Sequence, residues 1–133
     1  MLRPRVTCSA NPQSGLLIIR CIGNLDGQTA AERMRAHISA VPDAWDYDHI
    51  IDFGRFEGLF LGSDSEALLK WWSAASKGRD AGRLTAVISS DPLVQARQAI
   101  GQALMPNRRL AVFARFSEGC DWIIAERHAL AAA

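Results

Sequence analysis

Short β-rich runs alternate with helix-like segments along nearly the whole of this chain, and this alternation restricts the folds that it can adopt. The first two runs, 5–10 and 16–22, flank the turn-forming segment Asn11-Pro12-Gln13-Ser14-Gly15. Three more runs, each preceded by a helical pattern, follow at 49–53, 83–89 and 109–113. Strands that alternate with helices pair in parallel through right-handed crossovers. The sequence therefore predicts an α/β fold in which an antiparallel β-hairpin opens a mixed, mostly parallel sheet with helices packed on it.

The first two predicted helices have clear start signals. Asp26 can cap the first helix, and Pro42 ends it. The spacing of its apolar residues predicts one buried face, made of Ala30, Met34, Ile38 and Val41. The second helix begins with Ser63-Asp64-Ser65-Glu66, which has the form of a capping box, and runs to Ser76 or Lys77.

The last two predicted helices follow the strands at 83–89 and 109–113. Pro92 suits the first position of the third helix, because no backbone amide is missed there. The apolar periodicity predicts that its inner face consists of Leu93, Ala96, Ile100 and Ala103. Ser117 can cap the fourth helix.

The composition is that of an ordinary globular chain. With 133 residues, 49% hydrophobic and 22% charged, it can form one domain over 1–133 with its own core. Its 15 Lys and Arg residues nearly balance its 14 Asp and Glu residues, and a net charge of +1 supplies no field to attract nucleic acid. The apolar run 16–19 is too short for a signal peptide or a membrane span, so we expect a cytoplasmic location.

The cysteine and histidine residues lack the spacing of metal ligands. The cysteines are odd in number and contain no Cys-x-x-Cys pair, which favours buried free thiols at Cys8, Cys21 and Cys120. The histidines are scattered at His37, His49 and His128. We therefore predict no disulfide, no metal and no cofactor.

Four short pieces of the sequence carry a family resemblance. They are Gly15-Leu16-Leu17-Ile18-Ile19 leading to Gly23, Ile50-Ile51-Asp52-Phe53 followed by Phe56-Glu57-Gly58, Thr85-Ala86-Val87-Ile88, and Val112-Phe113 followed by Glu118-Gly119-Cys120-Asp121-Trp122-Ile123. In these pieces the chain resembles the SpoIIAA-like family, which is related to the STAS domains of anti-sigma-factor antagonists and sulphate transporters. The resemblance implies a binding or regulatory module without established catalysis. Relatives are thought to associate with membranes or to hold apolar ligands, in the manner of lipid carriers.

The second predicted helix carries more apolar bulk than one core contact needs. Trp71 and Trp72 lie about 100 degrees apart on it, so one indole is expected at an edge. Such an edge can wall a pocket for a lipid-like ligand, meet a membrane, or contact a second subunit in a homodimer, and ordinary core packing is the alternative. The predicted ligand-binding residues are Phe56, Phe60, Leu68, Trp71 and Trp72.

Two sets of polar residues follow the predicted strands. Open α/β sheets bind ligands beyond the carboxyl ends of their parallel strands, which predicts an anion-binding rim of Asp52, Arg55, Ser90 and Arg115. The resemblance implies a phosphoacceptor serine at the start of the helix after the Asp-bearing strand, the place of Ser63 and Ser65. The chain departs from the acceptor pattern there, because Ser65 is followed by Glu66-Ala67. A phosphorylation-controlled switch with a protein partner is thus an alternative function, and helix capping is the simpler role of these serines.

Acidic residues concentrate between Asp43 and Glu66, where Arg55 is the one basic residue. This acidic window suggests a small hydrolase as a weaker alternative, with Asp52 or Glu57 as general acid. No paired base is evident in the sequence, and the leading prediction is a non-enzymatic module.

Overall fold

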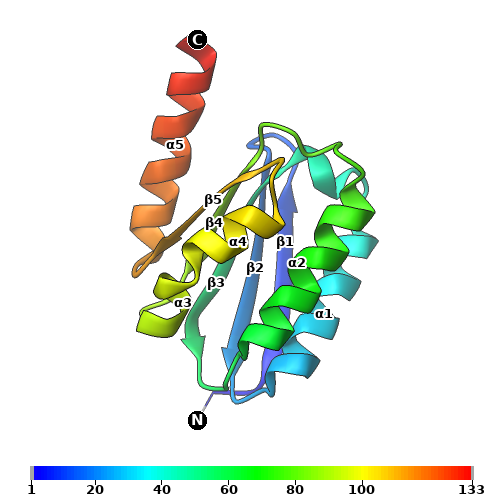
Figure 1. The fold of residues 1–133 in the computed structure, drawn as a ribbon, viewed down its shortest axis with the longest axis vertical. Coiled ribbons are helices and arrows are strands. Elements are labelled where there is room, and N and C mark those ends of the chain that lie inside the picture. The colour runs from blue at the N-terminus through cyan, green and yellow to red at the C-terminus, as the bar shows by residue number, and fades with distance from the viewer. Residues whose placement is uncertain (1, 133) are drawn as a thin grey trace.

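Five strands lie side by side in their sequence order in the computed structural model, which describes residues 2–132 (Figure 1). The strands are β1 (Arg5–Asn11), β2 (Leu16–Gly23), β3 (Asp48–Phe56), β4 (Leu84–Ile88) and β5 (Arg109–Phe113). β1 pairs with β2 antiparallel, and all other neighbours pair in parallel. The predicted α/β fold with a mixed, mostly parallel sheet and an opening hairpin is confirmed.

The helices cover the two faces of the sheet unequally. One face carries α1 (Gly27–Ala40), α2 (Gly62–Ser76), α3 (Pro92–Ala96) and α4 (Gln98–Leu104), whereas α5 (Phe116–Ala132) lies alone on the other. α5 packs on β3, β4 and β5, and its last turns extend past the end of the sheet (Figure 1). The larger core therefore lies under α1, α2 and α4.

Alternation along the strands divides the apolar side chains between these two faces. Leu17 and Ile19 of β2 are fully buried toward α1 and α2, while Ile18 between them packs on the α5 side. The first predicted helix is confirmed, because Met34 and Ile38 are buried and Asp26 Oδ1 accepts a hydrogen bond from the Thr29 amide at 2.9 Å.

Two predicted helix caps are wrong. α2 begins at Gly62, so Ser63 lies inside its first turn, and Asp64 Oδ2 accepts a hydrogen bond from the Leu61 amide at 3.1 Å. α5 begins at Phe116, so Ser117 is already helical, and Glu118 Oε1 accepts from the Arg115 amide at 3.0 Å. In both cases a carboxylate accepts a hydrogen bond from the free backbone amide three residues before it. The helix therefore starts before the serine that was predicted to cap it.

The third predicted helix is broken at Arg97 into α3 and α4, and its predicted inner face is wrong. Leu93 and Ile100 are 67% and 59% exposed. The polar face of α4 turns to the sheet instead, where Gln98 and Gln102 accept hydrogen bonds from backbone amides of the edge strand β5 at 2.9 and 2.8 Å. Backbone amides of an edge strand are costly to leave without acceptors. Hydrogen bonding to them therefore stabilises this orientation of α4 more than burial of Leu93 and Ile100 would stabilise the predicted one.

Arg108 is buried at the amino-terminal ends of β4 and β5, with 1% of its surface exposed. Its guanidinium donates hydrogen bonds to the Tyr47 carbonyl at 2.8 Å, the Leu84 carbonyl at 2.9 Å and the Thr85 hydroxyl at 2.8 Å. Asp80 Oδ2 lies 3.5 Å from Nη1. Burial lowers the pKa of Arg108 to about 10, against the raising effect of Asp80, so the side chain stays charged at neutral pH.

His49 is fully buried next to this arginine. Its Nε2 donates to the Ala44 carbonyl at 2.8 Å, and its ring centroid lies 4.7 Å from that of Trp72. Burial, and then the charge of Arg108, hold the pKa of His49 well below its ordinary value. The imidazole is therefore neutral in the folded protein.

We expect the Arg108→Leu substitution to lower the free energy of unfolding by about 3–5 kcal/mol, because it leaves Asp80 and two carbonyls buried without their partner. Arg109→Leu is the matched control, since Arg109 is exposed and pairs with Glu126 at the surface. Its cost should stay below about 1 kcal/mol. Urea unfolding of both variants measures the difference, and equal costs would contradict the structural role of Arg108.

Stability should fall as the pH is lowered through about 6.5. An unfolded histidine binds a proton near that pH, whereas buried His49 does not, so acid favours the unfolded chain. NMR of the imidazole nitrogens should show His49 neutral throughout the range in which the protein stays folded. A His49 titration midpoint at or above the ordinary histidine value would refute this assignment.

Candidate functional site

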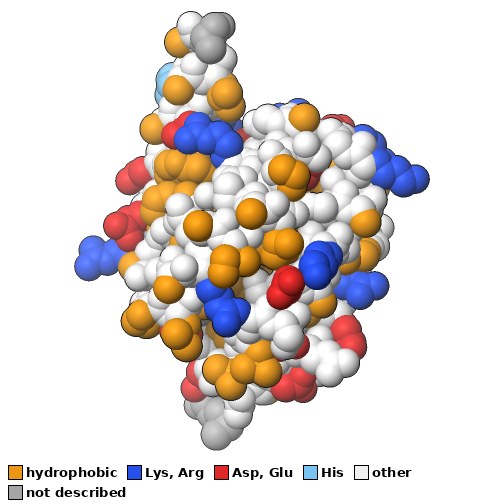
Figure 2. All heavy atoms as spheres, viewed as in Figure 1, with side chains coloured by type: hydrophobic (Ala, Val, Ile, Leu, Met, Phe, Trp, Pro, Cys, Tyr) orange, Lys and Arg blue, Asp and Glu red, His pale blue; other side chains and the backbone are white. Residues whose placement is uncertain are grey.

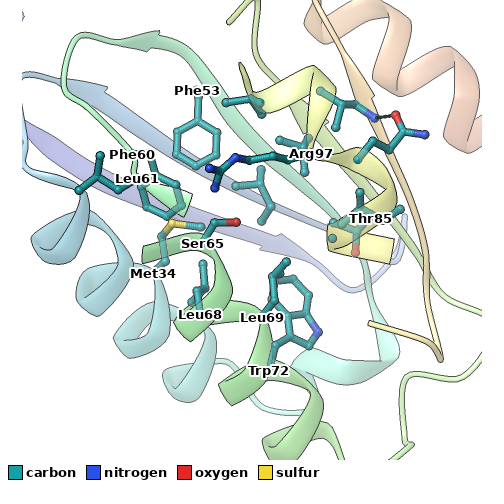
Figure 3. A pocket seen from close by; sticks show the side chains of 17 residues that line it. Met34, Phe53, Phe60, Leu61, Ser65, Leu68, Leu69, Trp72, Thr85 and Arg97 are labelled. Carbon is teal, nitrogen blue, oxygen red and sulfur yellow. Dashed lines mark hydrogen bonds between the residues drawn. The ribbon is translucent and has the colours of Figure 1, made fainter. Parts of the chain in front are cut away.

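An apolar cavity of about 90 Å³ lies between the sheet and the helices α2, α3 and α4. Its walls combine side chains from segments far apart in the sequence (Figure 3). α1 and α2 supply Met34, Leu68, Leu69 and Trp72, and the strands supply Ile51, Phe53, Val87, Leu110 and Val112. The strand residues are those whose side chains alternate toward α2, so the sheet forms the apolar floor.

The mouth of the cavity lies beside the segment 57–61, which joins β3 to α2. The rings of Phe53 and Phe60 meet there with centroids 5.1 Å apart, and Leu61 is 51% exposed. Gly58 lets this segment pass close to the chain before α1, because a Cβ at Gly58 would collide with the Leu25 carbonyl. Aromatic side chains thus stand at an entrance open to solvent.

Two polar side chains face the same mouth. The guanidinium of Arg97 reaches across it between Phe53 and Ser65 (Figure 3). It lies against Gly62, where a side chain would occupy the same space. Within residues 2–132, no hydrogen bond or ion pair engages the side chain of Arg97 or the hydroxyl of Ser65.

The inner end of the cavity has room because α4 carries a glycine there. A Cβ at Gly101 would meet Leu110 and Leu69 at 3.6 and 3.7 Å, which are ordinary contact distances. Trp72 closes this end beside Thr85, whose hydroxyl is already bonded to Arg108. The inner end is therefore apolar, and its polar residue Thr85 is hydrogen-bonded to the buried Arg108.

The arrangement of strands and helices resembles one in a solved protein. A crystal structure of an uncharacterized protein of the DUF3478 family from Shewanella loihica PV-4, which has a SpoIIAA-like fold, superposes with a TM-score of 0.55. The match covers 92% of this chain and 95% of the other, at 14% sequence identity. This chain has the SpoIIAA-like fold. No protein-family profile and no curated protein matches its sequence.

The SpoIIAA-like fold confirms the architecture that the sequence resemblance implied. The likeness is at the level of the fold, and the similar protein is itself uncharacterized. Chemistry must therefore be argued from the residues of this chain.

Three of the five predicted ligand-binding residues line the cavity: Phe60, Leu68 and Trp72. Phe56 lies outside the lining and packs on the ring of Phe53 with centroids 5.6 Å apart. Trp71 turns toward α1, with its ring 6.0 Å from that of Trp45 and 5.3 Å from the guanidinium carbon of Arg35. Trp72 is 1% exposed and Trp71 is half-buried, so Trp71 is the indole at the edge.

Within residues 2–132, no hydrogen bond or ion pair joins any two of the four residues of the predicted anion-binding rim. Asp52 Oδ2 accepts from Arg20 at 3.3 Å and Oδ1 from the Gly54 amide at 2.8 Å, and Arg20 also lies over the Phe116 ring of α5. Asp52 thus faces away from the cavity, since it alternates with Ile51 and Phe53. The other three residues of the predicted rim, Arg55, Ser90 and Arg115, are exposed.

The acidic residues between Asp43 and Glu66 lie toward both ends of β3 and do not gather in one place. Asp48 is buried at the start of β3, where it accepts from the Leu84 amide at 2.9 Å and from Arg127 at 2.7 Å, while Asp52 and Glu57 belong to the other end of the strand. Among residues 2–132, no group of three or more His, Cys, Asp or Glu side chains is arranged to hold a metal. Over the same residues, no helix is both long and apolar enough to cross a membrane.

The three cysteines are free thiols, but the prediction that all are buried holds for Cys21 alone, since Cys8 and Cys120 are half-buried. Cys21 is buried, and burial followed by the charge of Asp52 raises its pKa to about 12. Burial also raises the pKa of Cys8 and of Cys120. All three are poor nucleophiles, because the reactive thiolate is disfavoured.

Sequence reasoning missed the part of the site that α3 and α4 contribute. Val94, Arg97, Gln98 and Gly101 all line the cavity. The apolar periodicity pointed to Leu93 and Ile100 on the opposite side of these helices. No local signal identifies the true inner face, because it is set by hydrogen bonds to β5.

Proposed function

We propose that this STAS-like module is a ligand-binding protein that holds the apolar part of a small lipid-like molecule in the cavity. The observation that carries the proposal is the cavity itself: a space with an almost wholly apolar lining and aromatic side chains at its mouth. Sites for small molecules have this character, with mainly hydrophobic walls and a few placed polar groups. Ligand binding rather than catalysis is proposed, because Asp52, the predicted acid, is engaged by Arg20 away from the cavity.

The size of the cavity limits what it holds without rearrangement. A cavity of about 150 Å³ accommodates benzene, so about 90 Å³ suits a tail of only a few carbon atoms, and the carbons of a six-carbon chain nearest its head group would lie in the mouth. A longer tail would require α3 and α4 to move outward. These helices are suited to such movement, since α3 has no buried residue and Gly101 is the buried residue of α4.

Exposed apolar side chains belong to the same segments that line the cavity. They are Leu59, Leu61, Leu93 and Ile100, which are between 51% and 67% exposed. Figure 2 shows hydrophobic side chains over α3 and α4 and at the lower end of the molecule, with Lys and Arg side chains between them. Such a surface supports transient contact with a membrane, from which a lipid-like ligand could be taken up.

Filling the cavity should weaken the binding of an apolar probe. Gly101→Leu places a side chain between Leu110 and Leu69, and we expect the affinity for 1-hexanol to fall by about tenfold or more. Ala103→Leu adds the same side chain at an exposed position of the same helix and should leave the affinity unchanged. Isothermal titration measures both variants. Absence of hexanol binding by the unmodified protein, or equal affinity in the two variants, would refute the proposed site.

A phosphorylation-controlled interaction switch is the second candidate, and one observation favours it. Ser63 is exposed in the first turn of α2, close in sequence to exposed Leu59 and Leu61, whereas Ser65 is half-buried in the cavity lining. A phosphate on Ser63 would add nearly two negative charges beside Asp64 and change the surface offered to a protein partner.

If the switch operates, intact protein from its native cells should include a fraction heavier by one phosphate. Peptide mapping should place the phosphate on Ser63, and the Ser63→Ala variant should lack it while Ser90→Ala, at another exposed serine, keeps it. A protein that carries no phosphate under growth or stress would argue against this function.

A further inference from the structure

We propose that the ligand carries an anionic head group, a carboxylate or a phosphate, and that Arg97 binds this group at the mouth of the cavity. The inference rests on the proposed function and adds the chemical class of the ligand: a small amphipathic acid. Neither the family resemblance nor the similar structure assigns a role to this arginine.

The backbone holds Arg97 at the mouth. Arg97 is the residue at which α3 ends and α4 begins, with φ −95° and ψ 7°, and its amide donates to the Val94 carbonyl at 3.2 Å. From this break its side chain extends over the first residue of α2, Gly62. Figure 3 shows the guanidinium between Phe53 and Ser65, in front of the apolar interior.

Within residues 2–132, the guanidinium of Arg97 has no hydrogen-bonding or ion-pair partner. In the described part of the chain, ion pairs engage Arg20, Lys70, Arg108, Arg109 and Arg127, and none engages Arg97. A guanidinium presents five N–H donors in a planar fork that matches the two oxygens of a carboxylate or phosphate. The mouth therefore offers an anion a bidentate partner that no protein group occupies.

The surroundings of Arg97 select for an anion and against a cation. Arg97 is the one charged residue among those that line the cavity, and no carboxylate is among them. Asp64 and Glu66, which flank Ser65 in α2, lie outside the lining: Asp64 accepts from the Leu61 amide, and Glu66 pairs with Lys70 at 3.2 Å. The hydroxyl of Ser65 can supply a further donor to the same head group.

The cavity size and the polar mouth together define the ligand. The apolar interior accepts a short hydrocarbon tail, and the head group stays at the entrance, partly in water. Short-chain or medium-chain carboxylic acids and phosphate esters have this form. The head group of an anionic membrane lipid presents the same chemistry, so the test must separate a soluble acid from a bilayer lipid.

The test compares ligands that differ only in head charge. Hexanoate and hexanamide have the same tail and shape, and hexyl phosphate replaces the carboxylate. We expect both anions to bind the unmodified protein about tenfold or more tightly than hexanamide, since hydrogen bonds to charged groups are the stronger kind. Arg97→Gln should reduce hexanoate binding to the hexanamide level and leave hexanamide binding unchanged.

Two further variants separate a positioned charge from charge in general. Arg33→Gln removes an exposed arginine of α1 that does not line the cavity, and it should keep the anion preference. Gly62→Ala keeps Arg97 but fills the space that its guanidinium occupies, so it should weaken hexanoate binding as Arg97→Gln does. Thermal unfolding of each variant checks that the fold is retained.

Sedimentation with vesicles identifies the source of the anion. Attachment to phosphatidylcholine vesicles that contain phosphatidic acid, lost in Arg97→Gln, would support a bilayer lipid as the ligand. Hexanoate binding without vesicle attachment would support a soluble acid.

Three results would overturn the inference. Equal binding of hexanoate and hexanamide would refute the anionic head group while leaving the apolar cavity as a ligand site. An anion preference that persists in Arg97→Gln would refute the assignment to this arginine. Failure of hexanoate, hexanamide and hexanol alike to bind would refute the proposed function together with the inference.

Discussion

The buried guanidinium of Arg108 is the interaction on which the arrangement of the sheet depends. Its hydrogen bonds reach the segment before β3 at Tyr47 and both Leu84 and Thr85 of β4, and Arg108 itself leads directly into β5. A buried charge is costly to desolvate, and Asp80 with these acceptors offsets that cost. The ring of Trp72 lies 5.4 Å from the guanidinium carbon, so the same group positions α2 and the inner end of the cavity.

The cavity exists because α4 is held to the edge of the sheet by polar side chains. Gln98 and Gln102 complete the hydrogen bonding of β5 in place of a sixth strand. This attachment turns Gly101 toward the sheet, where a larger residue would fill the space, and leaves Ile100 in solvent. The break at Arg97 that allows this orientation also brings a cation to the mouth. Protection of the sheet edge and the form of the binding site are thus consequences of one packing arrangement.

The SpoIIAA-like fold supplies a scaffold, and the proposed function comes from side chains placed on it. At 14% identity, the similar structure shares the path of the chain and few of its residues. Folds of this kind can carry unrelated activities. The apolar lining of the cavity, the exposed apolar side chains of the segments around it and Arg97 therefore bear on function more directly than the architecture does.

Local patterns in the sequence were sufficient for the succession of strands and helices, the bounds of β5, the start of α1 and the free thiols. Alternation, turn residues and capping act over a few neighbouring positions, which is why the sequence shows them. The same patterns named Phe60, Leu68 and Trp72, whose bulk is visible in the sequence. They could not find Arg97 or Arg108. Only the tertiary structure decided that Arg108 is buried and Arg97 unpaired, and that α4 faces the sheet with glutamines. Those outcomes depend on hydrogen bonds and charges between segments that are far apart in the chain.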